Sequence, residues 1–428
     1  QPTMLLLLLL LLPSLLLADP SPLNTPDNPW GEYAAECLVD KPSVWDESRI
    51  ETTWYTIDLD KEAHDRWREV ATEFGPRMVA AVDVVKEMAN SFGGDGAWDM
   101  LVNLMIGVPE KMTEPYRTEI KAMSDMTGIQ LEQLTLLNLF YEIAAMCTSL
   151  VAVNHEGEVF HGRNLDFGLF YLWDTKEKTW DLTLRLRDLV AQYEFVKDGK
   201  LLFKAVTFAG HLGILTAVRP GAYSVSINTR FGSSLDTMTN FFLTGLAPDQ
   251  QFVLYANRDM MTNYATFEEA KNYIENIGIL ARAYFTMGSV DGGIVVTRAF
   301  NGTDHEAIID TKDPNGWYVL ETNYDWNEPD IFLDDRTNPG NHCMKQLGRK
   351  RVTKEGIFQV MSSKTTLNKS TVYTTVMEIK SGALYTFKQS CKDPCWFVDR
   401  VPLLEMLLLL LLLFRIFENI PSRAGSRP

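Results

Sequence analysis

Hydrophobic and polar positions alternate differently in the two parts of the chain. Residues 54–59 alternate one by one, which predicts a strand. Between residues 61 and 145 apolar side chains recur at helical spacing, for example Met78, Val82 and Val85, and a loop interrupts them at 93–96. We therefore expect the first part of the chain to be mainly helical.

After Cys147 the pattern becomes that of short strands. Residues 150–153 and 159–163 predict two strands joined by a hairpin turn at 154–157. Further strands are expected at 182–196, 201–208, 211–218, 223–228, 293–299, 306–310, 317–322, 371–379 and 383–388, and helices at about 235–246 and 267–278. This order of helices, strands, helices and strands favours a layered α+β architecture over a parallel βαβ sheet.

Two apolar runs lie near the ends of the chain. Residues 4–18 have the size of a signal-peptide core and are too short to span a bilayer comfortably, so we assign residues 1–18 to a signal peptide. Residues 19–50 are rich in Pro, Asp and Ser and predict an extended arm. The run at 403–414 contains Glu405, and we interpret residues 401–428 as an artefact of translation past a true end near Cys395, with a tail anchor as the alternative.

Composition narrows the class of protein. Of the 428 residues, 46% are hydrophobic, which is enough for a sizeable core. The formal net charge of −16 argues against nucleic-acid binding and fits an acidic compartment, where many carboxylates lose their charge. The six histidines have no metal-ligand spacing and Gly292-Gly293 is a bare pair rather than a phosphate loop, so we expect neither a metal nor a cofactor.

The chain contains five cysteines. In an oxidising compartment an odd number predicts two disulfides and one remaining thiol. Cys391 and Cys395 are close enough to close a small loop, and Cys37 and Cys343 can then pair over a long span. Cys147 would remain a thiol, either as an inert buried side chain or as a nucleophile.

Cys147 lies at the point where predicted helices give way to strands. A nucleophile in that position suits an N-terminal nucleophile hydrolase, whose own α-amine acts as the base. Arg163 would lie beside Cys147 at the end of the hairpin and favour a thiolate, and Asp166 would orient Arg163 or the new amine. For both, an ordinary ion pair in a turn is the alternative. A Cys–His dyad with His161 is the rival arrangement, although the sequence around Cys147 is not papain-like.

Five segments resemble the acid ceramidase family, of which N-acylethanolamine acid amidase is a close relative. They are Cys-Thr-Ser-Leu-Val-Ala at 147–152, His-Gly-Arg-Asn-Leu-Asp-Phe-Gly at 161–168, Thr-Asn-Tyr-Asp at 322–325, Leu-Asp-Asp-Arg at 333–336 and Val-Tyr-Thr-Thr at 372–375. The resemblance runs from about residue 30 to residue 396. It implies an αββα Ntn-hydrolase sandwich with an additional helical α-chain.

The resemblance also implies how the protein would work. The precursor would cut itself before Cys147, giving an α-chain of about 19–146 and a β-chain of 147 to about 400 that stay together as a heterodimer. Cys147 would then hydrolyse ceramide to sphingosine and fatty acid through a thioester. The reaction would take place in the lysosome, reached through the secretory pathway, with secretion as an alternative. An N-acylethanolamine substrate is the alternative activity, and a membrane surface or an activator protein would present the lipid.

Matching positions imply roles for further residues. Arg163 and Asp166 would lie beside the nucleophile, Asn323 would be an oxyanion-hole donor, and Arg336 would belong to the same polar network. Asn228 and Thr229 would contact substrate, but here the segment Asn-Thr-Arg-Phe at 228–231 has Thr229 where the family has Glu. That loss of a carboxylate leaves a catalytically impaired lipid-binding homologue as a third reading.

Three features concern the mature protein. A disulfide between Cys37 and Cys343 would tether the two chains after the cut. The sequons at Asn301 and Asn368 predict N-glycans on surface loops. Trp173 and the apolar α-chain helices would wall a channel for the lipid chains, with core packing as the alternative for Trp173.

Overall fold

The computed structural model describes residues 45–47, 53–144, 146–167, 173–174, 176–177, 179–230, 250–328, 330, 334–363 and 366–391, without the side chains of residues 92 and 140–144. The predicted signal peptide, most of the extended arm, the expected helix at 235–246 and the apolar run at 403–414 lie outside these residues.

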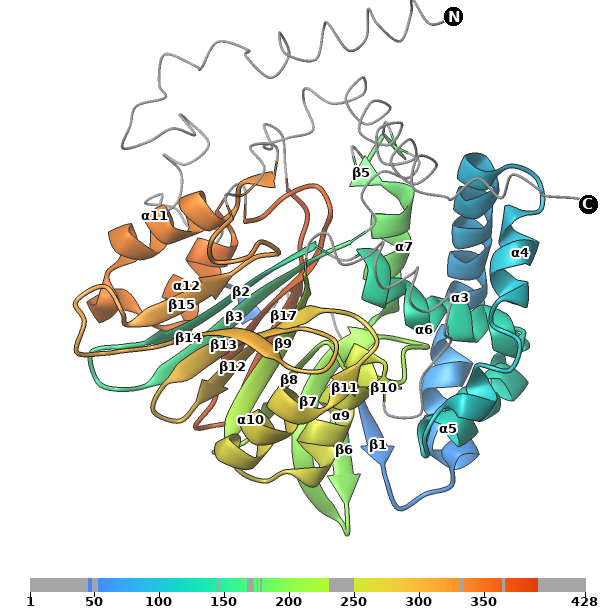
Figure 1. Cartoon of the computed structure of the whole chain (residues 1–428), viewed down its shortest axis with the longest axis horizontal. Coiled ribbons are helices and arrows are strands. Elements are labelled where there is room, and N and C mark those ends of the chain that lie inside the picture. The colour runs from blue at the N-terminus through green and yellow to red at the C-terminus, as the bar shows by residue number, and fades with distance from the viewer. Residues whose placement is uncertain are drawn as a thin grey trace, which may run out of the picture.

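Two β-sheets packed face to face form the centre of the molecule (Figure 1). The larger sheet has the order β1 (Trp54–Asp58), β6 (Val190–Lys197), β7 (Lys200–Phe208), β8 (Thr216–Arg219), β9 (Tyr223–Thr229), β12 (Ala283–Ser289), β13 (Gly293–Arg298) and β14 (Thr303–Ile308). The smaller sheet has the order β15 (Tyr318–Glu321), β2 (Met146–Val153), β3 (Val159–Asp166), β16 (Thr371–Glu378) and β17 (Ala383–Lys388).

The two sheets approach closely where β13 crosses β2. Val151 of β2 packs with Tyr284 and Val295 of the larger sheet. A Cβ atom built on Gly293 would lie 2.6 Å from Val151 Cγ1, so this position accepts only glycine at the observed spacing. Gly293 therefore serves the packing of the sheets.

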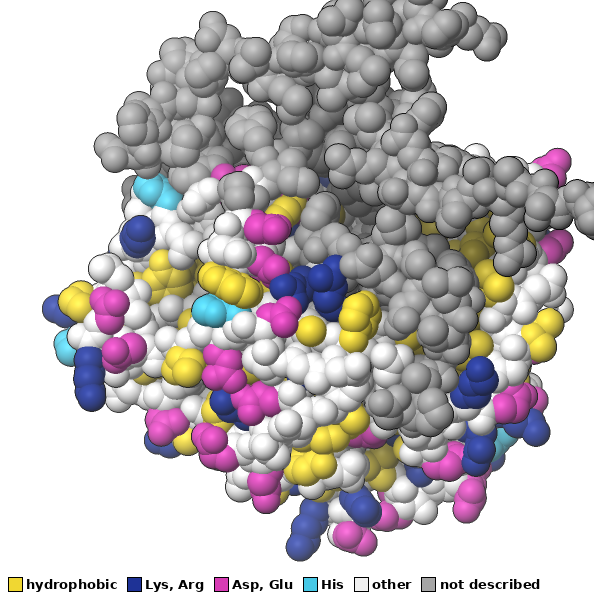
Figure 2. All heavy atoms as spheres, viewed as in Figure 1, with side chains coloured by type: hydrophobic (Ala, Val, Ile, Leu, Met, Phe, Trp, Pro, Cys, Tyr) yellow, Lys and Arg dark blue, Asp and Glu magenta, His cyan; other side chains and the backbone are white. Residues whose placement is uncertain are grey.

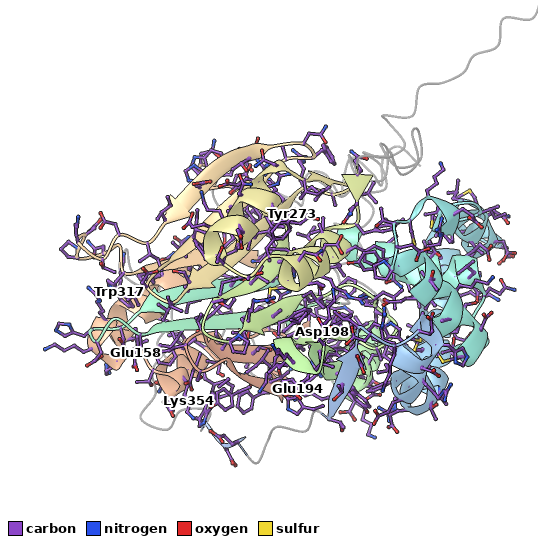
Figure 3. The ribbon with its side chains drawn as sticks, turned by 90° about the horizontal axis from the view of Figure 1, so that it is seen from below. Glu158, Glu194, Asp198, Tyr273, Trp317 and Lys354 are labelled. Atoms are coloured by element: carbon purple, nitrogen blue, oxygen red, sulfur yellow. The ribbon has the colours of Figure 1, made fainter. Side chains whose placement is uncertain are left out.

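Helices cover the outer face of each sheet. On the smaller sheet lie α11 (Thr337–Leu347) and α12 (Lys354–Met361), and on the larger sheet lie α9 (Val253–Asn263) and α10 (Phe267–Asn276). Figure 3 shows Lys354 of α12 and Tyr273 of α10 on opposite sides of the sandwich. Gly162 of β3 allows α12 to approach, because a Cβ atom there would lie 2.5 Å from Ile357 Cγ2. The expected αββα layering is confirmed.

The chain before Cys147 packs beside one end of this sandwich (Figure 1). It forms α3 (Ala63–Gly93), α4 (Ala97–Asn103), the 3₁₀ helix η2 (Pro109–Lys111), α5 (Tyr116–Thr127) and α6 (Leu131–Ala144). The strand predicted at 54–59 is confirmed as β1, which pairs in parallel with β6 through Tyr55 and Tyr193. The first part of the chain thus supplies an edge strand to the larger sheet as well as a helical bundle.

The strand predicted at 182–196 is wrong in its first half. Residues 181–189 form α7 (Asp181–Leu189), and only Val190–Lys197 continues as β6. Leu182, Leu186 and Leu189 are buried at the i, i+4, i+7 spacing of one helix face, so the local alternation of leucine with polar residues was misleading. The strand expected at 211–218 is shortened to β8. The patterns did not indicate β12, α9, α11 or α12.

A buried ionic cluster joins the helical bundle to the sandwich. Glu119 of α5 is fully buried and accepts hydrogen bonds from Arg258 of α9, one of them at 2.8 Å, and from Arg66 of α3. The Arg258 guanidinium also lies over the rings of Trp67, Tyr116 and Phe195. Glu119 and Arg258 therefore connect the parts of the chain that precede and follow Cys147.

The surface carries charges of both signs. On the face in Figure 2, acidic and basic side chains are interspersed among uncharged ones over α9, α10 and β14.

Three exposed apolar side chains, Met100, Leu104 and Ile106, gather on α4 and the turn after it. None of the described helices combines the length and the apolar character that a membrane span requires.

We predict that Glu119→Gln destabilises the protein by about 3–5 kcal/mol, because it leaves the buried Arg258 charge without its carboxylate. Urea denaturation of the purified protein measures this change. Glu73→Gln is the matched control, since Glu73 pairs with Arg77 on an exposed face of α3 and is worth no more than about 1 kcal/mol. Equal effects of the two substitutions would contradict the proposed importance of the cluster.

Candidate active site

Cys147 is the second residue of β2 and is completely buried. It is present as a thiol, whereas Cys343 and Cys391 are disulfide-bonded. Their expected partners, Cys37 and Cys395, lie outside the described residues, so the pairing remains a prediction. Pairing of β2 with β3 places Cys147 opposite Leu165, near the beginning of an interior strand of the smaller sheet.

Arg163 reaches the sulfur from the neighbouring strand. The hairpin predicted at 154–157 pairs Ser149 with Arg163, so the Arg163 side chain lies on the same inner face as Cys147. Its Nη2 donates to Cys147 Sγ at 3.0 Å and its Nη1 donates to the carbonyl of Ile227 at 2.8 Å. The guanidinium thus bridges the two sheets and places a positive charge where it stabilises a thiolate.

Asn323 and Arg336 hold the main chain of the nucleophile. Asn323 follows β15, and its Oδ1 accepts the Cys147 N–H at 2.9 Å and Arg336 Nη2 at 2.7 Å. Arg336 Nη1 donates to the carbonyl of Cys147. Although burial opposes its charge, the nearby Asp334 and Asp166 carboxylates hold the pKa of Arg336 above the usual value. Both residues that the resemblance adds to the site therefore touch Cys147 itself.

Asp166 lies on the other face of β3 from Arg163, so it does not orient that guanidinium. Its Oδ1 accepts from Thr371 Oγ1 at 2.6 Å, and its Oδ2 is 3.7 Å from Arg336 Nη1. Asp166 pairs with Met146 in the ladder, which places it beside the amide that precedes Cys147. Burial raises the pKa of Asp166 to about 6, against the opposing effects of Arg336 and Thr371.

Asn228 and Thr229 are hydrogen-bonded to the segment that ends at Asn323. The Asn228 amide donates to the carbonyls of Glu321 and Thr322 at 3.0 and 2.6 Å, and the Thr229 carbonyl accepts from Asn323 Nδ2 at 2.6 Å. Asn228 is fully buried and its Oδ1 accepts a further bond from within the protein. The structure therefore assigns the Asn228 side chain to holding the backbone rather than to substrate contact.

His161 does not form a dyad with Cys147. It pairs with Val151 in the ladder, and its two ring nitrogens lie 2.8 Å from Ser224 Oγ and 2.7 Å from Ser226 Oγ. Burial, assisted by the charge of Arg163, lowers the pKa of His161 to about 3. The imidazole is therefore neutral and has both nitrogens engaged away from the sulfur.

Trp173 packs against Trp180, with ring centroids 5.3 Å apart. The two tryptophans face each other in a small hairpin of β4 (Trp173–Asp174) and β5 (Thr179–Trp180) that leads into α7. Trp173 is partly exposed, and within the described part of the chain its ring contact is with Trp180 rather than with Cys147. Core-type packing thus accounts for the contact that the structure shows.

The two sequons differ in exposure. Asn301 is exposed in the turn between β13 and β14. Asn368 is only 9% exposed, and its Oδ1 accepts from the backbone N–H and the hydroxyl of Ser370 at 2.9 and 2.6 Å. The expectation of a surface loop at Asn368 is therefore wrong, because its side chain is built into the interior next to Asp166.

Sequence reasoning missed three groups near the site. Ser149 lies two residues after Cys147 on the same face of β2 and bonds to Asn228 at 2.6 Å. Tyr373 of β16 lies near Arg163 and Cys147, and burial raises its pKa to about 12. Burial, with Asp330 close by, raises the pKa of Glu321 well above its usual value. Ser149 had a signal in its i+2 spacing from Cys147, and Tyr373 lies in the family segment at 372–375, whereas Glu321 had none.

Two protein families match parts of this chain. The family of linear amide C–N hydrolases, choloylglycine hydrolase family, matches residues 147–348, and the beta subunit of N-acylethanolamine-hydrolyzing acid amidase matches residues 52–106. The N-acylethanolamine-hydrolyzing acid amidase ortholog of Caenorhabditis elegans is a solved structure with 30% identity and a TM-score of 0.48, covering 57% of this chain and 100% of that chain.

The chain aligns with curated relatives over almost the whole length of those proteins. The probable acid ceramidase of Caenorhabditis elegans is 34% identical over 378 residues, which are 86% of this chain and 93% of that protein. The acid ceramidase of Homo sapiens is 35% identical over 349 residues, which are 80% of this chain and 87% of that protein. The resemblance carried by the five motifs is confirmed, and the chain belongs to the acid ceramidase family.

Proposed function

We propose that this amide hydrolase cuts the amide bond of ceramide, with Cys147 as nucleophile. The proposal rests on the hydrogen bonds that buried side chains make to Cys147. Arg163 is bonded to its sulfur, Asn323 to its nitrogen and Arg336 to its carbonyl oxygen, and all of these groups are buried together. Membership of the acid ceramidase family supports ceramide as the substrate.

The chain first cuts itself between Met146 and Cys147. The sulfur attacks the carbonyl carbon of Met146, the S–C bond forms as the C–N bond breaks, and the nitrogen of Cys147 takes the proton that the thiol loses. Water then hydrolyses this thioester, which frees the carboxylate of Met146 and returns the thiol. The amide hydrolase family match begins at residue 147, and this supports a boundary there.

The same sulfur then acts on the substrate. The freed α-amine of Cys147 takes the thiol proton while the S–C bond to the acyl carbonyl forms, and it delivers that proton to the departing amine of the sphingoid base. Water hydrolyses the resulting thioester and releases the fatty acid. Because the base is part of the nucleophilic residue itself, a histidine at the sulfur is not required.

Charged and polar neighbours stabilise the charge that develops in this reaction. Arg163 stabilises the thiolate, and the Asn323 amide donates to the oxyanion of the tetrahedral intermediate. Arg336 fixes the Asn323 amide through its Oδ1 at 2.7 Å. Asp166 lies next to the position of the new amine and holds it by hydrogen bonding.

An N-acylethanolamine is the second candidate substrate. The match of residues 52–106 to the beta subunit of N-acylethanolamine-hydrolyzing acid amidase favours it, and the chemistry at the amide bond would be the same. The two lipids differ in the amine that leaves. Discrimination would therefore come from the walls around the leaving amine.

The setting of the reaction follows from the same proposal. The protein works in the lysosome as an α/β heterodimer, tethered by a disulfide between Cys37 and Cys343. A membrane surface or an activator protein presents the lipid, and the apolar helices before Cys147 contribute to the walls of the acyl channel. The partly exposed Trp173 lies beside that channel.

Cys147→Ala is expected to abolish both self-cleavage and amide hydrolysis, because the attacking sulfur is absent, and Cys147→Ser is expected to lose hydrolysis as well. Denaturing gels and N-terminal sequencing of acid-incubated protein measure the first effect, and release of fatty acid measures the second. The wild-type large fragment should begin at Cys147. Turnover by the alanine variant, or active wild type with an intact 146–147 bond, would refute the mechanism.

Wild-type protein is expected to hydrolyse ceramide with a higher kcat/KM than an N-acylethanolamine of the same acyl chain. Both substrates are presented in the same detergent at the same acid pH, and fatty-acid release is followed in each case. Using one acyl chain confines the difference to the leaving amine. A preference for the ethanolamide would replace ceramide by the second candidate without changing the mechanism.

The raised pKa of Asp166 predicts that the free energy of unfolding falls as the pH rises. With a folded pKa of about 6 and an ordinary value of 3.8, the folded state keeps a proton between these values that the unfolded state releases. The contribution of Asp166 to the free energy of unfolding is therefore fully present below pH 3.8. It falls by about 3 kcal/mol in all as the pH rises to 6 and above.

The test compares Cys147→Ala with Cys147→Ala/Asp166→Asn, since both chains stay uncut. The difference between their free energies of unfolding, measured with urea at several pH values from 4 to 7, should shift in favour of the Asn variant as pH rises. A constant difference, or a shift in favour of Asp166, would show that the carboxyl is not held protonated by burial.

A further inference from the structure

A line of hydrogen-bonded side chains crosses the interior between the two sheets, next to the nucleophile. It starts at His161 of β3, whose Nε2 lies 2.7 Å from Ser226 Oγ of β9. Ser226 Oγ lies 2.7 Å from Ser149 Oγ of β2, and Ser149 Oγ lies 2.6 Å from Asn228 Oδ1 of β9. All four side chains are completely buried, so these bonds are shielded from water.

The direction of every bond in this line is fixed by its far end. Asn228 Nδ2 faces two carbonyl oxygens, those of Glu321 and Thr322, and a carbonyl can only accept. Asn228 Oδ1 must therefore accept from Ser149. Because a hydroxyl has one proton, Ser149 in turn accepts from Ser226, and Ser226 accepts from His161.

His161 is consequently the Nε2–H tautomer, with Nδ1 as an acceptor. Ser224, the second serine at its ring, donates to Nδ1 across 2.8 Å. The line fixes a proton on Nε2, and burial together with the Arg163 charge keeps the ring neutral, since they lower its pKa to about 3. Over the acid range in which an ordinary histidine becomes charged, this line keeps its direction.

The line ends at Asn228, which is linked to Asn323, the residue proposed to stabilise the oxyanion. Asn228 clamps the two carbonyls that immediately precede Asn323, and the Asn323 amide is bonded to Thr229, the residue after Asn228. Residues 228–229 and 321–323 are thus cross-linked by side chains where no strand ladder pairs them. A small shift of Asn228 would move Asn323 relative to the Cys147 nitrogen that it binds at 2.9 Å.

We propose that His161, Ser226 and Ser149 are positioning residues, which orient Asn228 and through it hold the Asn323 amide in register with Cys147. This inference deepens the proposed function and rests on it. None of the three side chains needs to touch substrate. Their contribution is to fix a donor whose misplacement by about 1 Å can cost a hundredfold in rate.

Two serines of β9 provide a matched pair for the test. Ser224 and Ser226 are both completely buried, lie two residues apart on the same strand, and each bonds one nitrogen of His161. Only Ser226 lies between His161 and Asn323. Ser226→Ala and Ser224→Ala therefore remove the same group from the same environment, but only the first breaks the link to the Asn323 amide.

We expect Ser226→Ala to lower kcat for amide hydrolysis by about ten- to a hundredfold with little change in KM, and Ser224→Ala to leave kcat close to wild type. Urea unfolding of both variants shows whether their stabilities fall equally. If Ser226→Ala does not fold, Ser149→Ala breaks the next link of the same line and takes its place.

A double-mutant cycle identifies the residue through which Ser226 acts. In an Asn323→Ala background, whose residual turnover is measured first, the additional Ser226→Ala change should have no further effect on kcat. Equal kcat values for the two serine variants, or losses that simply add with Asn323→Ala, would overturn the positioning role while leaving the amidase intact. Absence of turnover in the wild-type protein would instead overturn the proposed function, and this inference with it.

Discussion

The arrangement of the interior depends on one buried charge, the guanidinium of Arg163. Removing a charge from water is costly unless the protein supplies partners for it. Here the partners come from both sheets, the sulfur of Cys147 on one side and the carbonyl of Ile227 on the other. Arg163 can therefore make both hydrogen bonds only at this spacing of the two sheets. The close approach of Gly293 and Val151 helps to set that spacing.

The need to keep this interior intact also accounts for the contacts of the chain before Cys147, which contributes a strand and a buried carboxylate to the fold. The proposed cut before Cys147 would release a new terminus inside a packed interior, and the site would survive it only if the earlier segment stayed in place. Strand β1 is hydrogen-bonded along the edge of the larger sheet, and Glu119 is enclosed by Arg258 and Arg66. Backbone pairing and a buried ionic cluster thus hold the two parts together independently of the peptide bond between them.

The sequence predicts those parts of this design that are local in the chain. A hairpin turn at 154–157 is sufficient to put Arg163 beside Cys147, because antiparallel pairing fixes which residues share a face. Asn323 and Arg336 are far away in sequence, and only the resemblance to a family located them. Local alternation failed at α7, where leucines fit a helix face as well as a strand. Asn228 was placed near the site, but its real partners are backbone carbonyls, which no residue pattern reveals.

Burial favours the neutral form of two titratable groups at the site. It lowers the pKa of His161 to about 3 and raises that of Asp166 to about 6, because in both cases the charged form is the one that loses its hydration. Near pH 5 both groups are therefore neutral, while Arg163 and Arg336 keep their charge. With the carboxyl of Asp166 protonated, fewer anions compete for these two guanidiniums. In the proposed mechanism, Arg163 would stabilise a thiolate at Cys147, while Arg336, paired with Asp334, would hold the Asn323 amide that donates to the oxyanion.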